Sequence, residues 1–231
     1  MPSVSLTQTL GVSHFTMPNP YIFENSSDLI KKLQADSTRE LANNFFAARL
    51  DSPKELIRQA VGPNTFRAFR KRVTPVLTFR PSVMFRDWAI KYISIEKIKV
   101  IRNETEFVNY IDCGVTNLNE FWEKEMCAEM GYGRGAKLLN LVLKKFVCHK
   151  GITDEQRSRL IQLLHVPLDS YTILGLRHVA PAEFNISNNP TMRFITERDQ
   201  YTDFQDFIIC IARKAGVPPI YYDILAWDLV H

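Results

Sequence analysis

The chain has 231 residues, of which 45% are hydrophobic and 23% are charged, and its formal net charge is +4. These values are ordinary for a soluble globular protein and suit one large domain or two small lobes that share a core. No uncharged apolar run is long enough to span a membrane, and the first ten residues lack the basic start and apolar core of a secretory signal. We therefore expect neither a membrane span nor a secreted protein.

Helix signals dominate from the start of the chain. Ser37 with Glu40 has the spacing of a capping box and predicts a helix that continues to about Leu50. A second capping box, Ser52-Pro53-Lys54-Glu55, places proline at the first helical position, where its missing N–H costs little. Residues 73–102 are rich in Val, Ile, Phe and Tyr, so this is the one segment where strands could lie.

The second half of the chain is also predicted to be helical. Apolar residues after Asn117 recur at helical spacing, Thr153 and Gln156 form another capping-box pair, and Gly216 is a typical helix terminator. The predicted helices cover residues 117–130, 153–164 and 203–214. The sequence thus favours a mainly α fold with a less regular, basic N-terminal half and no clear linker.

Basic residues are concentrated in two stretches. Between residues 67 and 102 ten basic residues stand against two acidic ones, and between 134 and 150 five basic residues stand against none. Segregated positive charge of this kind suits a polyanionic partner such as DNA or RNA. A solvated helical face carries such charges too, so the pattern leaves both interpretations open.

The four cysteines are at positions 113, 127, 148 and 210, so none belongs to a C-x-x-C pair and none has the spacing of a zinc site. Unpaired cysteines without metal-ligand spacing are typical of reducing compartments. We therefore expect reduced thiols in an intracellular protein and no metal site.

A glycine-rich turn precedes Lys137. The chain has only nine glycines, and three of them, Gly131, Gly133 and Gly135, stand directly before an amphipathic run. Glycines here permit unusual backbone conformations and close approach of a ligand backbone, and free N–H groups at a helix start favour a phosphate. The positive helix end should lower the pKa of a partly buried Lys137, which would make its amine a nucleophile able to form Schiff bases. The alternative is a surface lysine on an amphipathic helix.

The second informative stretch is HVPLDS, residues 165–170. Pro167 breaks the chain there, and Asp169 then stands at a helix N-cap position. By itself an aspartate at such a position is a structural cap. It gains interest because it follows Lys137 by 32 residues.

Together the two stretches resemble the helix–hairpin–helix DNA glycosylases. In that superfamily a G-x-G-x-K hairpin carries the Schiff-base lysine, and Gly133-Arg134-Gly135-Ala136-Lys137 is similar to it. A downstream V-P-x-D supplies the catalytic aspartate, and Val166-Pro167-Leu168-Asp169 is similar to that motif. The interval between the motifs and the C-terminal AGVPPIYYDILAW (215–227) look most like the archaeal 8-oxoguanine glycosylase class, AGOG. The resemblance covers about 131–227.

The resemblance implies a mainly α, helix–hairpin–helix glycosylase-like fold of two lobes with an active-site cleft between them. Residues 1–231 would form a single glycosylase-like domain, with a basic first lobe at about 1–115 and a hairpin and catalytic lobe at about 116–231. Residues 1–110 carry none of the motifs.

The resemblance also implies roles for single residues. Lys137 would be the nucleophile and Asp169 the catalytic carboxylate. The base pocket would include Leu141, Asp223 and Trp227, although the archaeal class has an aromatic residue where Leu141 stands, which leaves the identity of the base in doubt. The implied DNA-binding residues are Gly133, Arg134, Gly135, Lys144 and Lys145.

The implied function is a bifunctional DNA glycosylase and abasic-site lyase, which flips out and removes an oxidised purine such as 8-oxoguanine through a lysine Schiff base. No metal or organic cofactor is expected, and the cysteine gaps are too wide for the iron–sulfur cluster of related glycosylases. The expected partner is double-stranded DNA with a damaged base, bound by a monomer away from membranes, in the cytoplasm, nucleoid or nucleus. The alternatives are a non-catalytic nucleic-acid-binding protein, a glycosylase for a different damaged or modified base, and a helical interaction protein.

Overall fold

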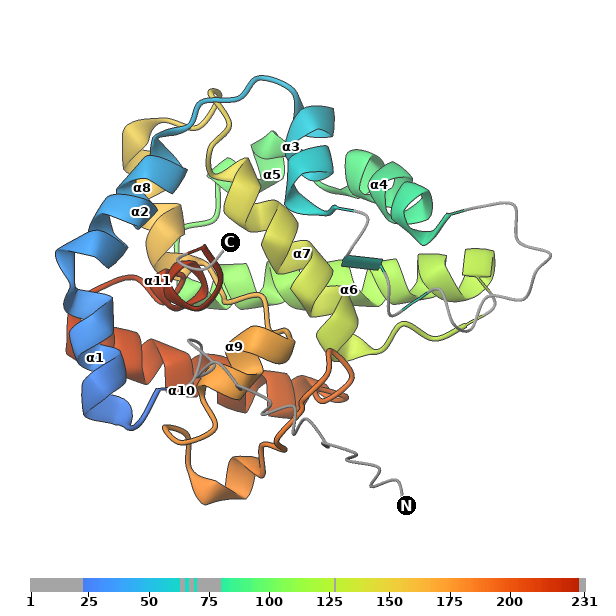
Figure 1. Cartoon of the computed structure of the whole chain (residues 1–231). Helices are drawn as coiled ribbons and strands as arrows, with labels where there is room; N and C mark the ends of the chain where they lie inside the picture. Colours follow the sequence, from blue (N-terminus) through green and yellow to red (C-terminus); the bar gives the residue numbers. More distant parts are fainter. Residues whose placement is uncertain (1–22, 63–64, 67–68, 70–79, 127, 229–231) are drawn as a thin grey trace, which may run out of the picture.

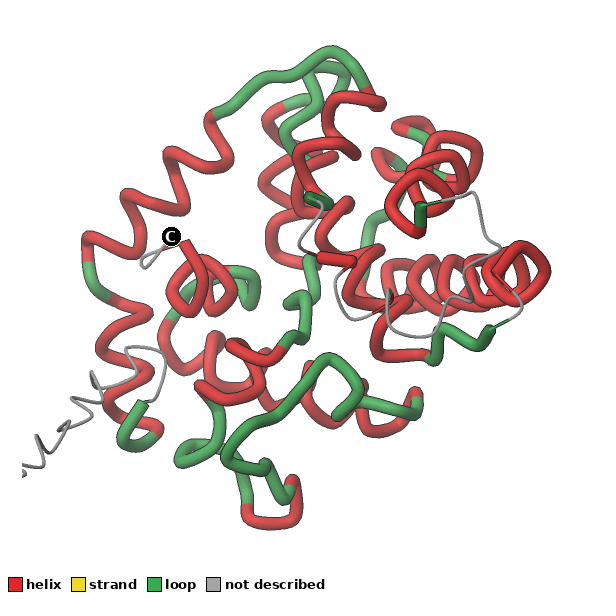
Figure 2. The backbone as a smooth tube through the Cα atoms, turned by 45° about the vertical axis from the view of Figure 1, so that its right-hand side comes forward, coloured by secondary structure: helices red, strands yellow, loops and turns green. Residues whose placement is uncertain are grey.

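The computed structural model describes residues 23–62, 65–66, 69, 80–126 and 128–228, and its regular elements in these ranges are helices (Figure 1; Figure 2). The mainly α fold predicted from the sequence is confirmed. The β-type pairing found in these ranges is an isolated bridge between Leu50 and His149. In the same ranges no helix combines the length and the apolar character that crossing a lipid bilayer requires.

Three of the five N-terminal helices in the described ranges begin after a residue whose side chain caps the first turn. Asn25 accepts a hydrogen bond from the Asp28 N–H at the start of the first helix. Ser52 accepts one from the Glu55 N–H, which confirms the predicted serine cap in front of Pro53. The helices are α1 (Ser26–Gln34), α2 (Asp36–Ala47), α3 (Pro53–Ala60), α4 (Pro81–Tyr92) and α5 (Ile95–Lys99).

The longest helix within the described residues lies in the second half of the chain. Thr153 and Gln156 form the predicted reciprocal capping box, and Gly216 ends its helix with φ 67°, as a terminating glycine should. The helices are α6 (Glu104–Met126), α7 (Tyr132–Phe146), α8 (Asp154–Leu163), α9 (Ser170–Gly175), the short 3-10 turn η2 (Ala182–Phe184), α10 (Arg198–Ala215), α11 (Tyr221–Asp223) and the π-helical turn η3 (Ile224–Asp228).

Three local predictions are wrong. Ala35, not Ser37, precedes α2, because only that residue separates α1 from α2 and the Thr38 hydroxyl already bonds to the last turn of α1 at Lys32 O. Asn117 lies inside α6 rather than before a helix. Residues 81–92 and 95–99 form helices instead of strands, since apolar content without alternation does not separate the two. Residues 73–79 lie outside the described ranges.

α7 is the central helix, and α3, α6 and α10 pack around it (Figure 1). The apolar side chains of Leu138, Leu139 and Val142 are fully buried, and each such burial stabilises the fold by about 1.5–3 kcal/mol. Polar residues of α7, among them Lys137 and Asn140, are buried as well. The helix is therefore enclosed on several sides and is not a surface helix with one apolar stripe.

A second group of contacts joins distant parts of the chain. α1 packs on α10, while α2 and α9 pack on η3. Residues 26–47 thus lie against residues 198–228. The predicted boundary between lobes at 115/116 falls inside the continuous helix α6, so the chain has no break there.

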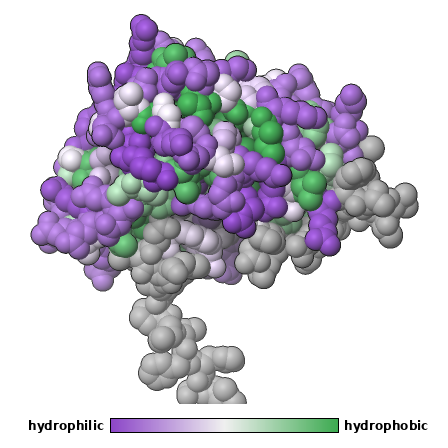
Figure 3. Space-filling model, turned by 90° about the horizontal axis from the view of Figure 1, so that it is seen from above, coloured by the Kyte–Doolittle hydropathy of each residue, from purple (hydrophilic) through white to green (hydrophobic). Residues whose placement is uncertain are grey.

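The surface is mostly polar where Figure 3 shows it. Hydrophilic side chains cover most of the face seen from above, and hydrophobic ones lie in smaller groups between them (Figure 3). The large hydrophobic residues that are exposed within the described ranges are Val83, Ile90 and Val100. Single exposed apolar residues are common on folded proteins and identify no site by themselves.

Candidate active site

The glycine-rich turn is built by packing as well as by backbone conformation. Gly131 precedes α7 with φ 81°, a value that favours glycine. Gly133 and Gly135 lie inside the helix, where neighbouring chain segments come very close. A Cβ atom at Gly133 would lie 2.4 Å from the Ile195 carbonyl oxygen, and one at Gly135 would lie 3.2 Å from Val115. Gly133 and Gly135 therefore make room for neighbouring segments of this chain, and their contact with a DNA backbone stays a prediction.

Lys137 is the sixth residue of α7, so it stands in the second turn and not in the first as predicted. The influence of a helix end falls off within the first turn. The residue is 7% exposed, which rules out the alternative of a surface lysine. A buried lysine requires partners for its amine, because burying an unpaired charge is costly. The chemistry open to Lys137 therefore depends on the groups around its amine.

Asp169 is the N-cap of α9, as the sequence predicted. Its Oδ1 accepts hydrogen bonds from the Tyr171 and Thr172 N–H groups at 2.9 and 3.1 Å, and the Thr172 hydroxyl accepts one from the Asp169 N–H at 2.8 Å. The chain before it is held by Gln205 of α10, whose amide exchanges two hydrogen bonds with the backbone of Val166. The carboxylate is thus fixed by its own cap and by a buried glutamine.

The fold brings Lys137 and Asp169 together. Lys137 Nζ lies 3.3 Å from Asp169 Oδ2, and the two side chains are 9% and 12% exposed. Because Oδ1 serves the cap, Oδ2 is the oxygen that faces the amine. The geometry is that of a buried ion pair, in which a carboxylate that can take up a proton stands beside an amine shielded from water.

Lys137 has a further partner that no sequence motif indicated. Its Nζ also donates to the sulfur of Met192 at 3.1 Å. Met192 is half-buried in the connection that precedes α10. A methionine in a connection between helices gives no periodic or motif signal, so only the tertiary structure could identify it.

A second lysine–aspartate pair lies on the same side of α7. Residues seven positions apart on a helix share a face, so Lys144 follows Lys137 two turns later with Leu141 between them. Lys144 Nζ lies 2.7 Å from Asp223 Oδ2, and the side chains are only 6% and 7% exposed. Lys144 is therefore not on a solvated face, which corrects its prediction as a phosphate contact. Asp223 and Leu141, both pocket candidates, do lie on this side of the helix.

An aromatic ring stands next to Lys144, and two further rings pack on each other between α9 and η3. Lys144 Nζ and Lys145 Nζ lie 4.2 and 4.0 Å from the centre of the Phe45 ring. The rings of Tyr171 and Trp227 are 5.0 Å apart, which places Trp227 beside the residue that follows Asp169 and Ser170. The sequence identified Trp227 but missed Phe45 and Tyr171, because neither belongs to a motif.

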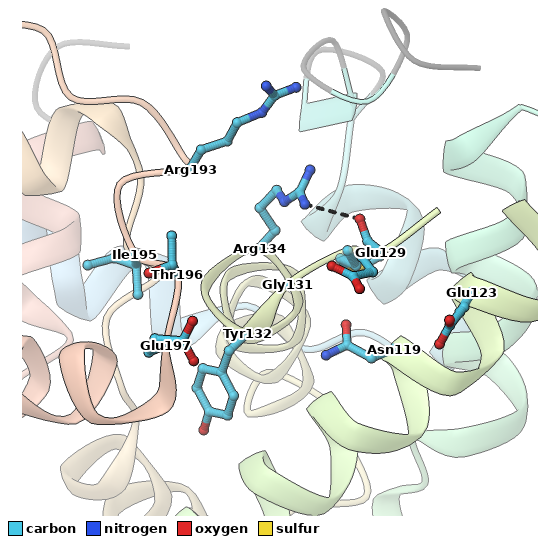
Figure 4. A pocket seen from close by; sticks show the side chains of 11 residues that line it. Asn119, Glu123, Glu129, Gly131, Tyr132, Arg134, Arg193, Ile195, Thr196 and Glu197 are labelled. Atoms are coloured by element: carbon cyan, nitrogen blue, oxygen red, sulfur yellow. Dashed lines mark hydrogen bonds between the residues drawn. The ribbon is translucent and has the colours of Figure 1, made fainter. Parts of the chain in front are cut away.

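A hollow of about 530 Å³ opens beside the first turn of α7 (Figure 4). The side chains of Arg134 and Arg193 extend toward the same side of it, and Arg134 also donates to the Glu129 carbonyl at 3.1 Å (Figure 4). Arg134 is one of the predicted DNA-binding residues, whereas Arg193 was not predicted. Three carboxylates also line the hollow, namely Glu123, Glu129 and Glu197.

A buried polar chain fixes the middle of α7. Asn140 donates to the Tyr201 hydroxyl at 2.7 Å, and that hydroxyl lies 2.9 Å from His165 Nδ1. Burial lowers the pKa of His165 to about 4, so the imidazole is neutral at physiological pH. Burial also raises the pKa of Tyr201, which keeps its hydroxyl protonated.

Neighbouring groups tie α6 and α10 to the start of α7. Arg198 of α10 donates to the Asp112 carboxylate of α6, and Tyr132 of α7 donates to the same group. Although burial alone would raise it, these hydrogen bonds lower the pKa of Asp112. Three helices that surround the candidate site thus share one carboxylate.

Metal ligands do not assemble near these residues. Within the described ranges no three His, Cys, Asp or Glu side chains are placed to hold one ion. Cys113, Cys148 and Cys210 are free thiols, and Cys127 lies outside the described residues. Of the predicted basic stretch 67–102, the residues Arg67, Arg70, Lys71 and Arg72 also lie outside them.

Comparison with known protein families, with curated proteins and with solved structures found no match to this chain.

Proposed function

We propose that this protein is a DNA glycosylase with associated abasic-site lyase activity. The observation that carries the proposal is the buried contact of 3.3 Å between Lys137 Nζ and Asp169 Oδ2. Lys137 and Asp169 belong to two short motifs that resemble those of the helix–hairpin–helix glycosylases. The fold brings the two side chains into contact. The proposal includes the two-lobed helix–hairpin–helix architecture of that superfamily.

In the proposed reaction a damaged nucleotide leaves the base stack and enters the site. Asp169 stabilises the positive charge that develops at the sugar C1′ and accepts a proton from the lysine, so that Lys137 can attack C1′ as a neutral amine. The base leaves with the electrons of the broken C–N bond. Ring opening of the aminal then gives the Schiff base, and loss of a C2′ proton expels the 3′ phosphate and cuts the strand.

The second pair supports recognition of a base rather than of the phosphate backbone. Lys144 and Asp223 form a buried ion pair next to the Phe45 ring, on the face of α7 that carries Lys137, and we propose that a base edge exchanges hydrogen bonds with these two groups once it enters the site. A flipped base is held by hydrogen bonds to its edge and by stacking on aromatic side chains. Phe45 and Trp227 are half-buried aromatic residues, and in the proposal they stack on the base in place of Leu141. The proposed substrate is an oxidised purine such as 8-oxoguanine.

The proposal is tested by borohydride trapping of the protein on duplex DNA that contains 8-oxoguanine or a preformed abasic site. Wild type should form a covalent adduct and cut the strand. Lys137→Gln should form no adduct, since the amine that attacks C1′ is gone, yet it should bind DNA normally. Lys124→Gln, which changes an exposed lysine of α6, is the matched control and should trap as wild type does.

Asp169→Asn completes the test. An asparagine oxygen can keep the two N–H contacts of the cap, so the fold should survive. Loss of the charge next to Lys137 should slow excision of 8-oxoguanine by about 10²–10³-fold, the range typical for removal of one preorganised electrostatic group. Trapping by Lys137→Gln equal to that of wild type would show that Lys137 is not the nucleophile.

A further inference from the structure

Two atoms from other parts of the chain contact the amine of Lys137. Asp169 Oδ2 lies 3.3 Å from Nζ, and Met192 Sδ lies 3.1 Å from it. The lysine side chain is only 9% exposed. In this state, therefore, a substrate atom that approaches the nitrogen from either of these two sides must displace the neighbour that stands there.

The segment that carries Met192 is anchored on both sides of that residue. Pro190 is buried before it, and Ile195 is 3% exposed after it. Ile195 packs on Gly133, where the absent Cβ leaves room for its carbonyl oxygen. The Phe194 ring lies 6.0 Å from that of Phe204 on α10. These anchors hold the backbone of residues 190–195 against the start of α7, so Met192 is directed at the amine.

We propose that Met192 is a gate residue, whose side chain occupies the position from which the amine of Lys137 must attack. Reacting atoms in a productive complex approach to about 3–3.5 Å, and the methionine sulfur already lies within that distance of Nζ. The sugar carbon and the sulfur cannot both occupy this position. The part of the inference that concerns catalysis rests on the proposed function, whereas the blocked amine rests on geometry alone.

The same contact is suited to opening. A thioether is a weak acceptor, so its loss costs little, and methionine has three rotatable bonds and no branch. The side chain can therefore turn away while Pro190 and Ile195 keep their places. Asp169 cannot leave as easily, because its other oxygen caps α9 through two N–H groups. Of the two neighbours of the amine, Met192 is the one that yields to substrate.

The first test measures access to the amine without DNA. Formaldehyde with cyanoborohydride methylates accessible lysines, and peptide mass spectrometry follows the rate at Lys137. Methylation of Lys137 should be slow in wild type and roughly tenfold faster in Met192→Ala, a factor equivalent to about 1.4 kcal/mol of barrier. Met192→Leu keeps the volume and should react at the wild-type rate. Asn189→Ala, an exposed change in the same connection, should also match wild type.

The outcomes separate the gate from a different role of Met192. An unchanged or lower rate in Met192→Ala, at an unchanged melting temperature, would overturn the proposal. Equal acceleration in Met192→Ala and Met192→Leu would overturn it too, because the sulfur contact and not the occupied volume would then restrain the amine. The exposed Lys124 serves as the internal reference for each protein, since its methylation should not vary.

A second test links the gate to the proposed reaction. On a duplex with a preformed abasic site, Met192→Ala should be trapped by borohydride faster than wild type at subsaturating protein. If access changes but no variant is trapped on DNA, the gate stands and the proposed function fails. If wild type is trapped and Met192→Ala shows neither faster trapping nor faster methylation, the function stands and the gate fails.

Discussion

Two lysines seven residues apart on α7 are buried against carboxylates from other parts of the chain. Lys137 lies beside Asp169 of the α9 cap, and Lys144 lies beside Asp223 of α11. Burying two charges is expensive unless they are paired, and a pair adds little net stability compared with apolar residues of similar size. Such pairs in the interior are more informative about a site than about stability.

The Lys144–Asp223 pair yields a stability prediction. Lys144→Met should destabilise the protein by about 3–5 kcal/mol, because the buried carboxylate of Asp223 loses the ammonium group 2.7 Å from it. Urea unfolding at neutral pH measures the change. Adding Asp223→Leu to the variant should restore part of the loss, since the buried charge is then removed as well.

A matched control for this prediction is the exposed pair of Lys150 and Asp51. Its atoms are as close, at 2.6 Å, but the side chains are 63% and 62% exposed. Lys150→Met should therefore cost less than about 1 kcal/mol. Equal effects of Lys144→Met and Lys150→Met would contradict the interpretation that burial decides the cost.

At the scale of elements, the start of α7 is defined by what packs on it. The connection before α10 crosses the helix at Gly133, and α6 crosses it at Gly135. Glycine weakens a helix interior by about 0.5–1 kcal/mol relative to alanine, so two glycines in the first turns need a reason. The reason in this structure is close approach, which also brings Met192 to Lys137.

Gly133→Ala tests this close approach. Alanine is the better helix former, yet its Cβ would lie 2.4 Å from the Ile195 carbonyl oxygen, so the connection must shift. We expect a net destabilisation of about 1–3 kcal/mol, typical of overpacking, measured by urea unfolding. Gly62→Ala is the control, because a Cβ there meets no atom of the described residues within 4 Å. A Gly133→Ala protein as stable as the Gly62→Ala protein would show that the contact is loose.

For the whole molecule, a buried polar chain connects three segments that are distant in sequence. His165 from the connection before α9, Tyr201 of α10 and Asn140 of α7 are joined by hydrogen bonds of 2.9 and 2.7 Å. The imidazole is 5% exposed and is packed edge-on against Phe107. A charge on this ring would have no compensating partner within the chain of hydrogen bonds, so the fold requires neutral His165.

This requirement makes stability depend on pH. The pKa of His165 is lowered by burial to about 4 from its usual 6.5, so below pH 6.5 the unfolded chain binds a proton that the folded protein does not. Stability is therefore complete above pH 6.5 and is lost as the pH falls toward 4. The loss from this residue should be about 2 kcal/mol at pH 5.

Urea unfolding at pH 7 and pH 5 measures that loss, with His165→Gln as the comparison. The variant cannot titrate in this range, so its stability should change less between the two pH values than that of wild type. Carboxylates with a lowered pKa, such as Asp112, change stability only at still lower pH. Wild type and the variant both contain them, so they do not affect the comparison. Parallel changes in the two proteins would show that His165 does not carry the dependence.

The sequence by itself determined the helical class, several helix caps and the two residues that stand at the centre of the candidate site. Caps at Ser52, Thr153 and Asp169 were predictable because a side chain and the N–H groups two or three residues later form a local unit. The local signal failed at Ser37, where α1 imposes the start of α2. Lys137 and Asp169 were predictable as a pair only through their resemblance to known motifs.

The tertiary structure alone decided what surrounds that pair. No local sequence pattern distinguishes Met192 or Phe45 from other residues of their type. The sequence around Lys144 would be the same whether its side chain faced water or Asp223. Burial depends on which segments pack on a helix, and α7 is enclosed by α3, α6 and α10 from both halves of the chain. The sequence could place a lysine after the glycines, but only packing over long sequence distances could make it a buried amine with a carboxylate on one side and a sulfur on the other.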